Sequence, residues 1–206
     1  MKPLSQPELL LEQVEYQTAG CLVRGSGHYG TGLHLLSGPI GSGKSTIAGL
    51  MAGILSPDSG KVQRNHISRS LLSVQFPEYY ITSVTVAGEI ASWGILEEKA
   101  LSLLSSLSLE KRADDPVMSL SRGELKRLHL ACVRMQDAEL MIYDEPFASL
   151  DAQGQEWVRD SLLDAASSRI IVISTHYGMF DMIPSDLVVS HSKMSDGFLY
   201  QISGAL

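Results

Sequence analysis

The feature that most constrains the fold is a glycine-rich run, GPIGSGKST, at residues 38–46. It fits the pattern G-x-x-x-x-G-K-[ST] and stands between an apolar stretch at residues 33–36 and the helix-like IAGLMAGIL at residues 47–55. A strand, a glycine loop and a helix in this order bind phosphate well, because backbone N–H groups and a helix N-terminus surround the anion. The sequence therefore predicts an α/β fold with a phosphate site at this loop.

Each position of this run, the phosphate loop, is a candidate contact to a nucleotide. Lys44 would place a positive charge at the terminal phosphates, and the Ser45 hydroxyl could bind Mg²⁺. The alternative is a structural glycine-rich turn, which the strand and helix on either side disfavour. The candidate nucleotide-binding residues are Gly38, Pro39, Ile40, Gly41, Ser42, Gly43, Lys44, Ser45 and Thr46.

A second glycine pattern, GSGHYG at residues 25–30, fits G-x-G-x-x-G. It precedes the apolar stretch at residues 33–36 instead of opening a helix after a strand. A hairpin or loop is therefore favoured over a dinucleotide site.

Two adjacent carboxylates follow an apolar run in ELMIYDEP, residues 139–146. At the end of a buried strand, Asp144 can hold the Mg²⁺ shell, and Glu145 can reach a water aligned with the terminal phosphorus. The alternative, a solvated acidic turn, is disfavoured because the four residues before Asp144 are apolar enough to bury the strand.

The apolar runs also indicate how the chain is organised. Those at residues 33–36, 140–143 and 170–173 are typical of buried parallel strands. Between them the pattern changes to mainly helical, with helices expected at residues 85–95 and 97–107. We therefore expect a single domain over residues 1–206, with a helical subdomain at about 76–137 inserted in an α/β core.

Composition excludes several classes of protein. With 44% hydrophobic residues the chain is not disordered, and a net charge of −7 argues against a nucleic-acid partner. No apolar run is long enough to cross a bilayer, and the N-terminus lacks the apolar region of a secretion signal. Cys21 and Cys132 lie far apart without ligand-spaced neighbours, so they predict neither a disulfide framework nor a zinc site.

The run LSRGELKR, residues 120–127, resembles the signature sequence of ABC-type ATPases. Other motifs follow in that family's order: Gln75 resembles its Q-loop glutamine, residues 149–151 its D-loop, and His176 its switch histidine. The resemblance extends from about residue 9 to about residue 196. VQFPE at residues 74–78, together with TVAGEI at residues 85–90, is most similar to the ATPases of energy-coupling-factor importers, which carry vitamins or transition-metal ions.

The resemblance implies an ATP-binding subunit of an ABC transporter, with ATP and Mg²⁺ as ligands. The implied fold is a P-loop NTPase core with a mainly parallel sheet, a small N-terminal antiparallel β part and an inserted helical subdomain. The implied partners are a transmembrane transporter subunit and a second ATPase subunit, identical or paralogous, on the cytoplasmic face of the cell membrane. The implied catalytic residues are Glu145, His176 and Gln75, the metal ligands are Ser45, Gln75 and Asp144, and Ser121 and Gly123 contact the nucleotide of the other subunit in a head-to-tail pair.

The chain departs from the family pattern at three places. Arg122 stands where the family has a small residue, and Glu124 stands where glutamine is common. Thr18 occupies the usual place of an aromatic residue that stacks on adenine, with Tyr16 as the nearest candidate. Within the expected helix after Ser121, helical spacing predicts a buried face of Leu125, Leu128, Cys132 and Met135, with Lys126, Arg127 and Arg134 elsewhere.

Two other functions stay open at this point. One is a soluble ABC-type ATPase that acts as a mechanical or assembly module, and the other is a P-loop phosphotransferase, which has no use for a signature sequence. The aromatic residues of FPEYYI, residues 76–81, are either interface anchors in a loop or part of the core.

Overall fold

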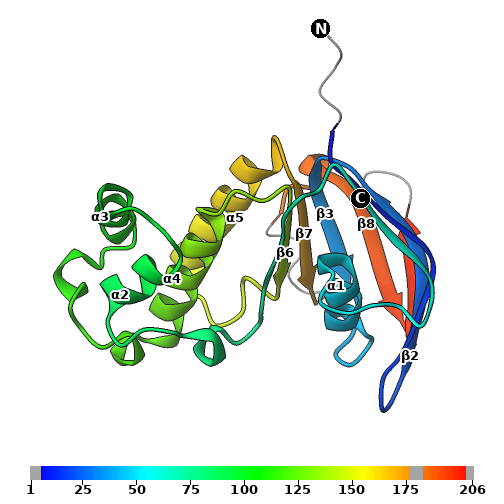
Figure 1. Ribbon diagram of the computed structural model, residues 1–206, viewed down its shortest axis with the longest axis horizontal. Coiled ribbons are helices and arrows are strands. Elements are labelled where there is room, and N and C mark those ends of the chain that lie inside the picture. Colours follow the sequence, from blue (N-terminus) through cyan, green and yellow to red (C-terminus); the bar gives the residue numbers. More distant parts are fainter. Residues whose placement is uncertain (1–5, 177–182, 203–206) are drawn as a thin grey trace, which may run out of the picture.

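The computed structural model describes residues 6–176 and 183–202, which contain one nine-stranded sheet in the order β4-β1-β2-β9-β8-β3-β7-β6-β5 (Figure 1). The sheet has a parallel and an antiparallel part. The strands are β1 (Glu8–Gln17), β2 (Leu22–Tyr29), β3 (Gly32–Ser37), β4 (Ser59–Asn65), β5 (Ser70–Ser73), β6 (Leu140–Asp144), β7 (Ile170–Thr175), β8 (Val188–Ser195) and β9 (Phe198–Ile202).

The parallel part contains the three strands that the apolar runs predicted. β3 lies between β7 and β8, and β6 lies between β7 and β5, with all four pairings parallel. Every residue of β6 and β7 is buried. Continuous burial of this kind requires cover on both faces of the sheet, which explains why these strands read as unbroken apolar runs.

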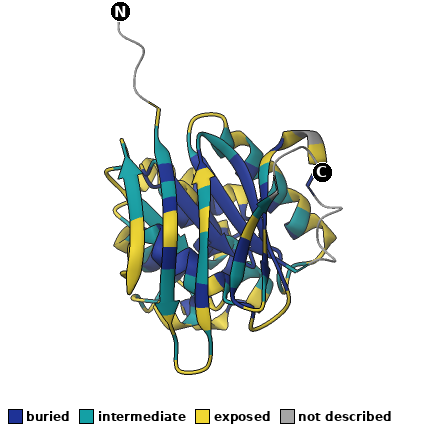
Figure 2. Cartoon of the chain, turned by 90° about the vertical axis from the view of Figure 1, so that its right-hand side faces the viewer, coloured by how far each residue is buried: buried dark blue, intermediate teal, exposed yellow. Residues whose placement is uncertain are grey.

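Antiparallel pairs occur in the hairpin of β1 and β2, in β4 on the outer side of that hairpin, and between β8 and β9. β2 and β9 pair in parallel and join the hairpin to the rest of the sheet. Residues 25–29 of the GSGHYG segment lie in β2, the second strand of this hairpin, and Gly30 follows it. Glycine is needed there for close strand approach, because a Cβ at Gly25 would lie 2.5 Å from the Cβ of Leu199 in β9. Buried residues alternate with more exposed ones at the start of β1, as expected for a sheet with one solvated face, whereas no residue of the outer strand β4 is buried (Figure 2).

Helices cover both faces of the sheet. α1 (Lys44–Ala52) packs on one face, enclosed between the parallel strands and the curved antiparallel strands. α5 (Ala152–Ala166) and part of α4 (Arg122–Arg134) pack on the opposite face through Leu130, Val133 and Leu162. The P-loop fold class predicted from the sequence is therefore confirmed.

The connection from β5 to β6 is mostly helical and has its own hydrophobic cluster. α2 is shorter than predicted because Gly94, at φ 73°, turns the chain soon after its last residue. The division into one domain, 1–206, with an insertion at about 76–137 stays a prediction. In the order of the chain, this segment contains η1 (Pro77–Tyr80), α2 (Val86–Ser92), α3 (Glu97–Ser106), η2 (Glu110–Arg112), η3 (Val117–Ser119) and α4, and a further 3₁₀ turn, η5 (Ser185–Leu187), precedes β8.

No helix in the described part of the chain combines the length and the hydropathy that a membrane span requires.

Candidate active site

The phosphate loop connects the end of β3 to the start of α1, as the sequence predicted. Gly43 is the residue before the helix and has φ 97°, a left-handed conformation that favours glycine. A Cβ at Gly43 would also lie 2.7 Å from Cγ2 of Val23. Glycine at this position therefore allows both the turn and the close packing of the loop against β2.

Two side chains in the phosphate loop are buried and polar. The Lys44 ammonium donates to the carbonyl oxygens of Gly38, at 2.9 Å, and Pro39, at 3.0 Å. The Ser42 hydroxyl is buried and has no hydrogen-bond partner among the described residues. A buried donor of this kind suits an anionic oxygen, so the loop fits a nucleotide phosphate. Ile40, by contrast, is 86% exposed.

A hydroxyl and a carboxylate meet where α1 begins and β6 ends. Ser45 Oγ donates to Asp144 Oδ2 at 2.7 Å, and the Ser174 hydroxyl, from β7, donates to Asp144 Oδ1. Asp144 is 8% exposed. Hydroxyl and carboxylate oxygens are the ligands that Mg²⁺ prefers, so this pair fits a magnesium ion.

Glu145 follows directly after β6 and is held between two cationic or titratable groups. Its Oε1 lies 2.9 Å from His176 Nε2 and 4.0 Å from Lys44 Nζ. Burial raises the pKa of Glu145 above its usual value, while His176 and Lys44 lower it in part. A carboxylate with a raised pKa is a stronger base than an exposed one. The arrangement can therefore accept a proton near the phosphate loop.

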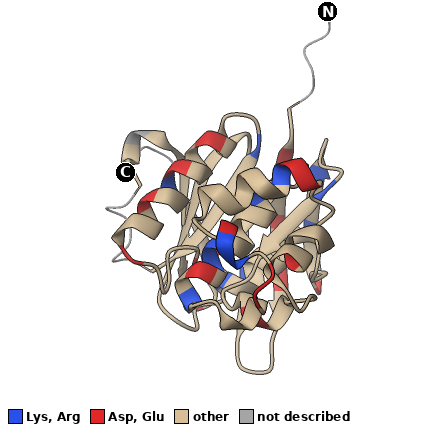
Figure 3. Cartoon of the chain, turned by 90° about the vertical axis from the view of Figure 1, so that its left-hand side faces the viewer, with Lys and Arg blue, Asp and Glu red and all other residues tan. Residues whose placement is uncertain are grey.

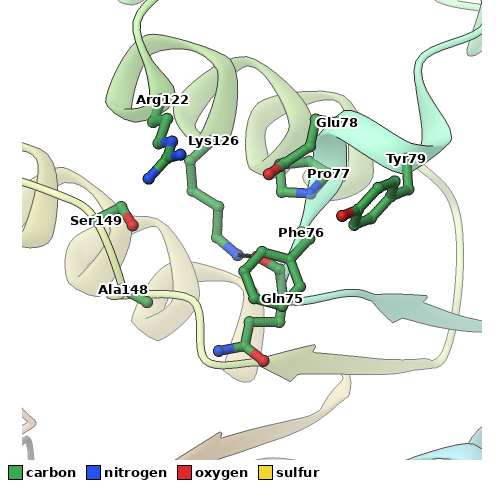
Figure 4. Close-up of a pocket in the computed structure, with 9 residues that line it drawn as sticks. All are labelled: Gln75, Phe76, Pro77, Glu78, Tyr79, Arg122, Lys126, Ala148 and Ser149. Atoms are coloured by element: carbon green, nitrogen blue, oxygen red, sulfur yellow. Dashed lines mark hydrogen bonds between the residues drawn. The ribbon is translucent and has the colours of Figure 1, made fainter.

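Gln75 lies at the other side of the site, just beyond β5. Its side chain is exposed, and no hydrogen bond joins it to Ser45 or Asp144 in the described residues. It borders a pocket of about 260 Å³ between the segment after β5, the N-terminal half of α4 and the segment after β6 (Figure 4). The residues that line this pocket are Gln75, Phe76, Pro77, Glu78, Tyr79, Arg122, Lys126, Ala148 and Ser149.

The predicted faces of α4 are wrong at two positions. Lys126 is only 2% exposed, whereas Met135 is 39% exposed. The reason is that α4 is covered on two sides, by the helical segment through Leu125 and by the sheet through Val133. Leu130 and Val133 were the sequence signal for this second buried face.

Lys126 is a residue of the site that sequence reasoning missed. Its ammonium donates to the carbonyl oxygens of Gln75, at 3.0 Å, and Val74, at 3.3 Å. Burial lowers the pKa of Lys126 to about 8, and the carboxylates of Asp144, Glu78 and Glu145 oppose this effect. Lys126 therefore connects α4 with the segment that carries Gln75.

Ser121 and Gly123 lie at the N-terminus of α4, and no hydrogen bond connects them with the phosphate loop in the described residues. Ser121 caps the helix: its hydroxyl accepts from the Glu124 N–H, and Glu124 Oε2 accepts from the Ser121 N–H at 2.7 Å. Arg112 also bonds the Glu124 carboxylate at 3.2 Å. Glutamate in place of glutamine therefore completes a capping box and an ion pair.

A second pocket, of about 220 Å³, adjoins the phosphate loop on the side of the β1–β2 hairpin. Thr18, Cys21 and Val23 line it together with residues of the loop. Tyr16 packs against the hydrophobic core instead. No aromatic side chain among the described residues lines this pocket, so an adenine bound there would have no ring to stack on.

Comparison with known proteins agrees with this geometry. A family model described as "ABC transporter" matches residues 29–148, more than half of the chain. The "Nod factor export ATP-binding protein I" of Sinorhizobium fredii is 32% identical over 161 residues, which cover 69% of this chain and 47% of that protein. The "Zinc import ATP-binding protein ZnuC" of Pseudomonas fluorescens is 33% identical over 126 residues, which cover 58% of this chain and 47% of that protein.

A solved structure titled "Structure of ATP binding subunit of ABC transporter" shares the fold. It superimposes with a TM-score of 0.81 at 20% identity, covering 96% of this chain and 90% of that chain. By contrast, the chain spans about half the length of the curated relatives that it matches.

Proposed function

We propose that this chain, which belongs to the ABC transporter family of ATP-binding domains, binds and hydrolyses ATP to power a membrane transporter. The observation that carries the proposal is the meeting of Lys44, Ser45, Asp144, Glu145 and His176 at the carboxyl ends of β3, β6 and β7. Ligands of parallel α/β sheets bind at this edge. A charge for phosphate, oxygen ligands for a metal and a base are present together.

In this proposal the phosphate loop binds the triphosphate and exchanges its internal bonds for bonds to phosphate. Lys44 moves its donors from the carbonyls of Gly38 and Pro39 to the β- and γ-phosphates, and Ser42 donates its free hydroxyl. Ser45, Asp144 and Gln75 would hold Mg²⁺, and the ion would supply positive charge to the phosphate oxygens.

Glu145 acts as the general base. Its carboxylate takes a proton from a water, the water oxygen bonds to the γ-phosphorus, and the bond from that phosphorus to the β-phosphate oxygen breaks, giving ADP and phosphate. His176, at 2.9 Å from Glu145, orients that carboxylate and donates to the γ-phosphate. Gln75 senses whether the γ-phosphate is present, and the position of the segment that follows it changes accordingly.

The nucleotide site is completed by a second ATPase subunit, identical or paralogous, in a head-to-tail pair. Among the described residues, Ser121 and Gly123 form no hydrogen bond with the phosphate loop of their own chain, and they lie where α4 presents its N-terminal N–H groups. They contact the γ-phosphate of the other subunit's nucleotide. A single subunit therefore carries two incomplete halves of different sites.

The membrane subunit docks on residues 76–81, here called the coupling segment. Phe76, Tyr79 and Tyr80 are 51%, 80% and 56% exposed, which supports the interface interpretation over the core one. Exposed aromatic residues beside a pocket are favoured anchors of protein interfaces. The chain would then lie on the cytoplasmic face of the membrane. We propose no nucleic-acid partner, because Lys and Arg are interspersed with Asp and Glu on the helical side (Figure 3).

The transported substrate is a vitamin or a transition-metal ion, and the direction is import. The support for this finer proposal is the sequence of residues 74–78 and 85–90 and the similarity to a relative named for zinc import. A relative of similar identity is named for export.

Two measurements test the proposed function. The purified protein is expected to hydrolyse ATP without an acceptor, and Lys44→Ala is expected to weaken nucleotide binding. A requirement for an acceptor would instead favour a phosphotransferase. Tagged protein extracted from membranes with detergent is expected to bring a transmembrane subunit with it. ATP hydrolysis without any membrane partner would favour a soluble assembly module.

A further inference from the structure

The pocket between Gln75 and α4 contains a buried lysine that the proposed chemistry does not use. Lys126 comes from the second turn of α4, and its side chain reaches across the pocket to the end of β5 (Figure 4). Burying a lysine is costly unless its ammonium is well bonded. The burial of Lys126 between α4 and the segment after β5 therefore depends on the partners of its ammonium.

Among the described residues, the Lys126 ammonium is bonded to the backbone and not to a carboxylate. The ammonium does not form an ion pair with Glu78, although both line the same pocket. It donates to two successive backbone carbonyls, those of Val74 and Gln75, at the point where the chain leaves β5. Hydrogen bonds from charged donors are stronger than neutral ones, so these two bonds fix the backbone that carries the Gln75 side chain.

We infer that Lys126 is a positioning residue that holds Gln75 in place for its role at the metal site and makes that position depend on α4. The geometry gives this link a direct route. α4 begins at Ser121, and Lys126 lies little more than one turn later on the same rigid helix. A displacement at the N-terminus of α4 is therefore transmitted to the Gln75 backbone through one side chain. The inference rests on the proposed function.

The substitution that tests this role is Lys126→Met. Methionine keeps the length and the burial of the side chain but removes all three donors. Lys126→Arg keeps a cation with donors, and Arg127→Met, one position along on the half-exposed side of α4, is the matched control. Thermal melts confirm that each variant is folded.

The first readout needs neither nucleotide nor metal. Hydrogen exchange of residues 74–81 is expected to be about 10-fold faster in Lys126→Met, because two bonds that hold this backbone are lost. Exchange in α1 is expected to be unchanged. The Arg127→Met protein should match the wild type in both segments.

The second readout is the Mg²⁺ dependence of nucleotide affinity and of hydrolysis. Residues that orient a metal ligand typically contribute about 10-fold or more to metal affinity or activity. In Lys126→Met, the Mg²⁺ concentration for half-maximal effect should rise about 10-fold, ATP affinity in EDTA should be unchanged, and Lys126→Arg should recover part of the loss.

Wild-type Mg²⁺ dependence and wild-type exchange in Lys126→Met would overturn the inference. A loss of ATP affinity in EDTA as large as the loss in Mg²⁺ would also overturn it, because general damage to the site would then be the cause. If the wild-type protein neither binds nor hydrolyses MgATP, the proposed function fails together with this inference. Failure of the inference alone appears only in the Lys126→Met variant, whereas failure of the proposed function appears in the wild-type protein.

Discussion

At the scale of single residues, the site depends on side chains whose environment changes their chemistry. Glu145 shows this best, because it combines burial, a nearby cation and a left-handed backbone at φ 52°. Such a backbone is unfavourable for glutamate and persists only where the surroundings impose it. The end of β6 therefore places this carboxylate at the cost of some stability.

Replacing Glu145 by glutamine is expected to lower hydrolysis by about 10²-fold or more, because the amide cannot accept a proton. ATP binding should survive, since the phosphate loop is unchanged. Turnover and equilibrium binding measured on the same sample test this, with Glu156→Gln on the exposed side of α5 as the control. Near-normal turnover would remove Glu145 from the role of base.

His129 gives a prediction for the pH dependence of stability. Burial, together with the nearby charge of Lys126, lowers the pKa of His129 to about 4. An unfolded histidine binds a proton near pH 6.5, so the unfolded state gains protons first as the pH falls. The contribution of His129 to the free energy of unfolding is therefore complete above pH 6.5. As the pH falls from 6.5 to 4, about 3 kcal/mol of this contribution is lost.

Urea unfolding at pH 7.5, 5.5 and 4.5 measures this loss. His129→Gln should lose less free energy of unfolding across the series than the wild type. His66→Asn is the control, because His66 is exposed and asparagine tolerates its left-handed backbone at φ 56°. Parallel curves for His129→Gln and the wild type would show that His129 is not responsible.

At the scale of elements, the coupling segment has the form of a short 3₁₀ helix, η1, whose rings point outward. Pro77 is buried and anchors it, while Tyr79 and Tyr80 are exposed. The loop that follows is held by Glu89 in α2, whose carboxylate accepts from the N–H groups of Thr82 and Ser83. The aromatic residues are therefore displayed on a well-anchored turn.

Tyr79→Ala combined with Tyr80→Ala is expected to weaken assembly with the membrane subunit or to uncouple transport from hydrolysis. The free energy of unfolding should change by no more than about 0.5 kcal/mol per residue, because both side chains are exposed. Leu101→Ala, a 63% exposed apolar residue on α3, is the control. Pull-down from detergent-solubilised membranes beside a thermal melt decides the matter: intact assembly and transport, or a collapsed melting temperature, would each contradict the proposal.

Sequence alone predicted the elements whose signal is local. The strands at residues 33–36, 140–143 and 170–173 are buried on both faces, and the glycine loop is specified by adjacent residues, so both were visible in the sequence. The burial of Lys126 was not, because its partners lie 51 and 52 positions away. Contacts of that range depend on tertiary packing, which overrides a single periodic pattern.

At the scale of the whole molecule, the residues proposed for one nucleotide lie at two separate places. The phosphate loop lies at the edge of the sheet where β3 ends, whereas Ser121 begins α4 on the helical segment. If two copies pair head to tail, each site takes its loop from one chain and its α4 N-terminus from the other.

This arrangement predicts complementation between two inactive variants. Lys44→Ala should weaken nucleotide binding, and Ser121→Arg should block closure while its own loop still binds ATP. A mixed pair contains one site with an intact loop and an intact α4, so an equal mixture should recover about one quarter of wild-type hydrolysis. Sedimentation should show ATP-dependent pairs in the mixture.

The two-subunit site would be rejected if Ser121→Arg weakened ATP binding by the isolated monomer as much as Lys44→Ala does and the mixture recovered no hydrolysis. The membrane-docking proposal would be unaffected, because it depends on a different surface.

The bonds from Lys44 to the carbonyls of Gly38 and Pro39 have a consequence for the energetics of recognition. Lys44 already holds the phosphate loop in an ordered conformation before nucleotide binds. An arriving nucleotide therefore meets a preformed site and not a chain that must first be ordered. Association then loses little backbone entropy, and the main exchange is enthalpic, carbonyl oxygens for phosphate oxygens around one ammonium. When product leaves, the same two carbonyls take the ammonium back, so the receptor returns to its starting shape for the next turnover.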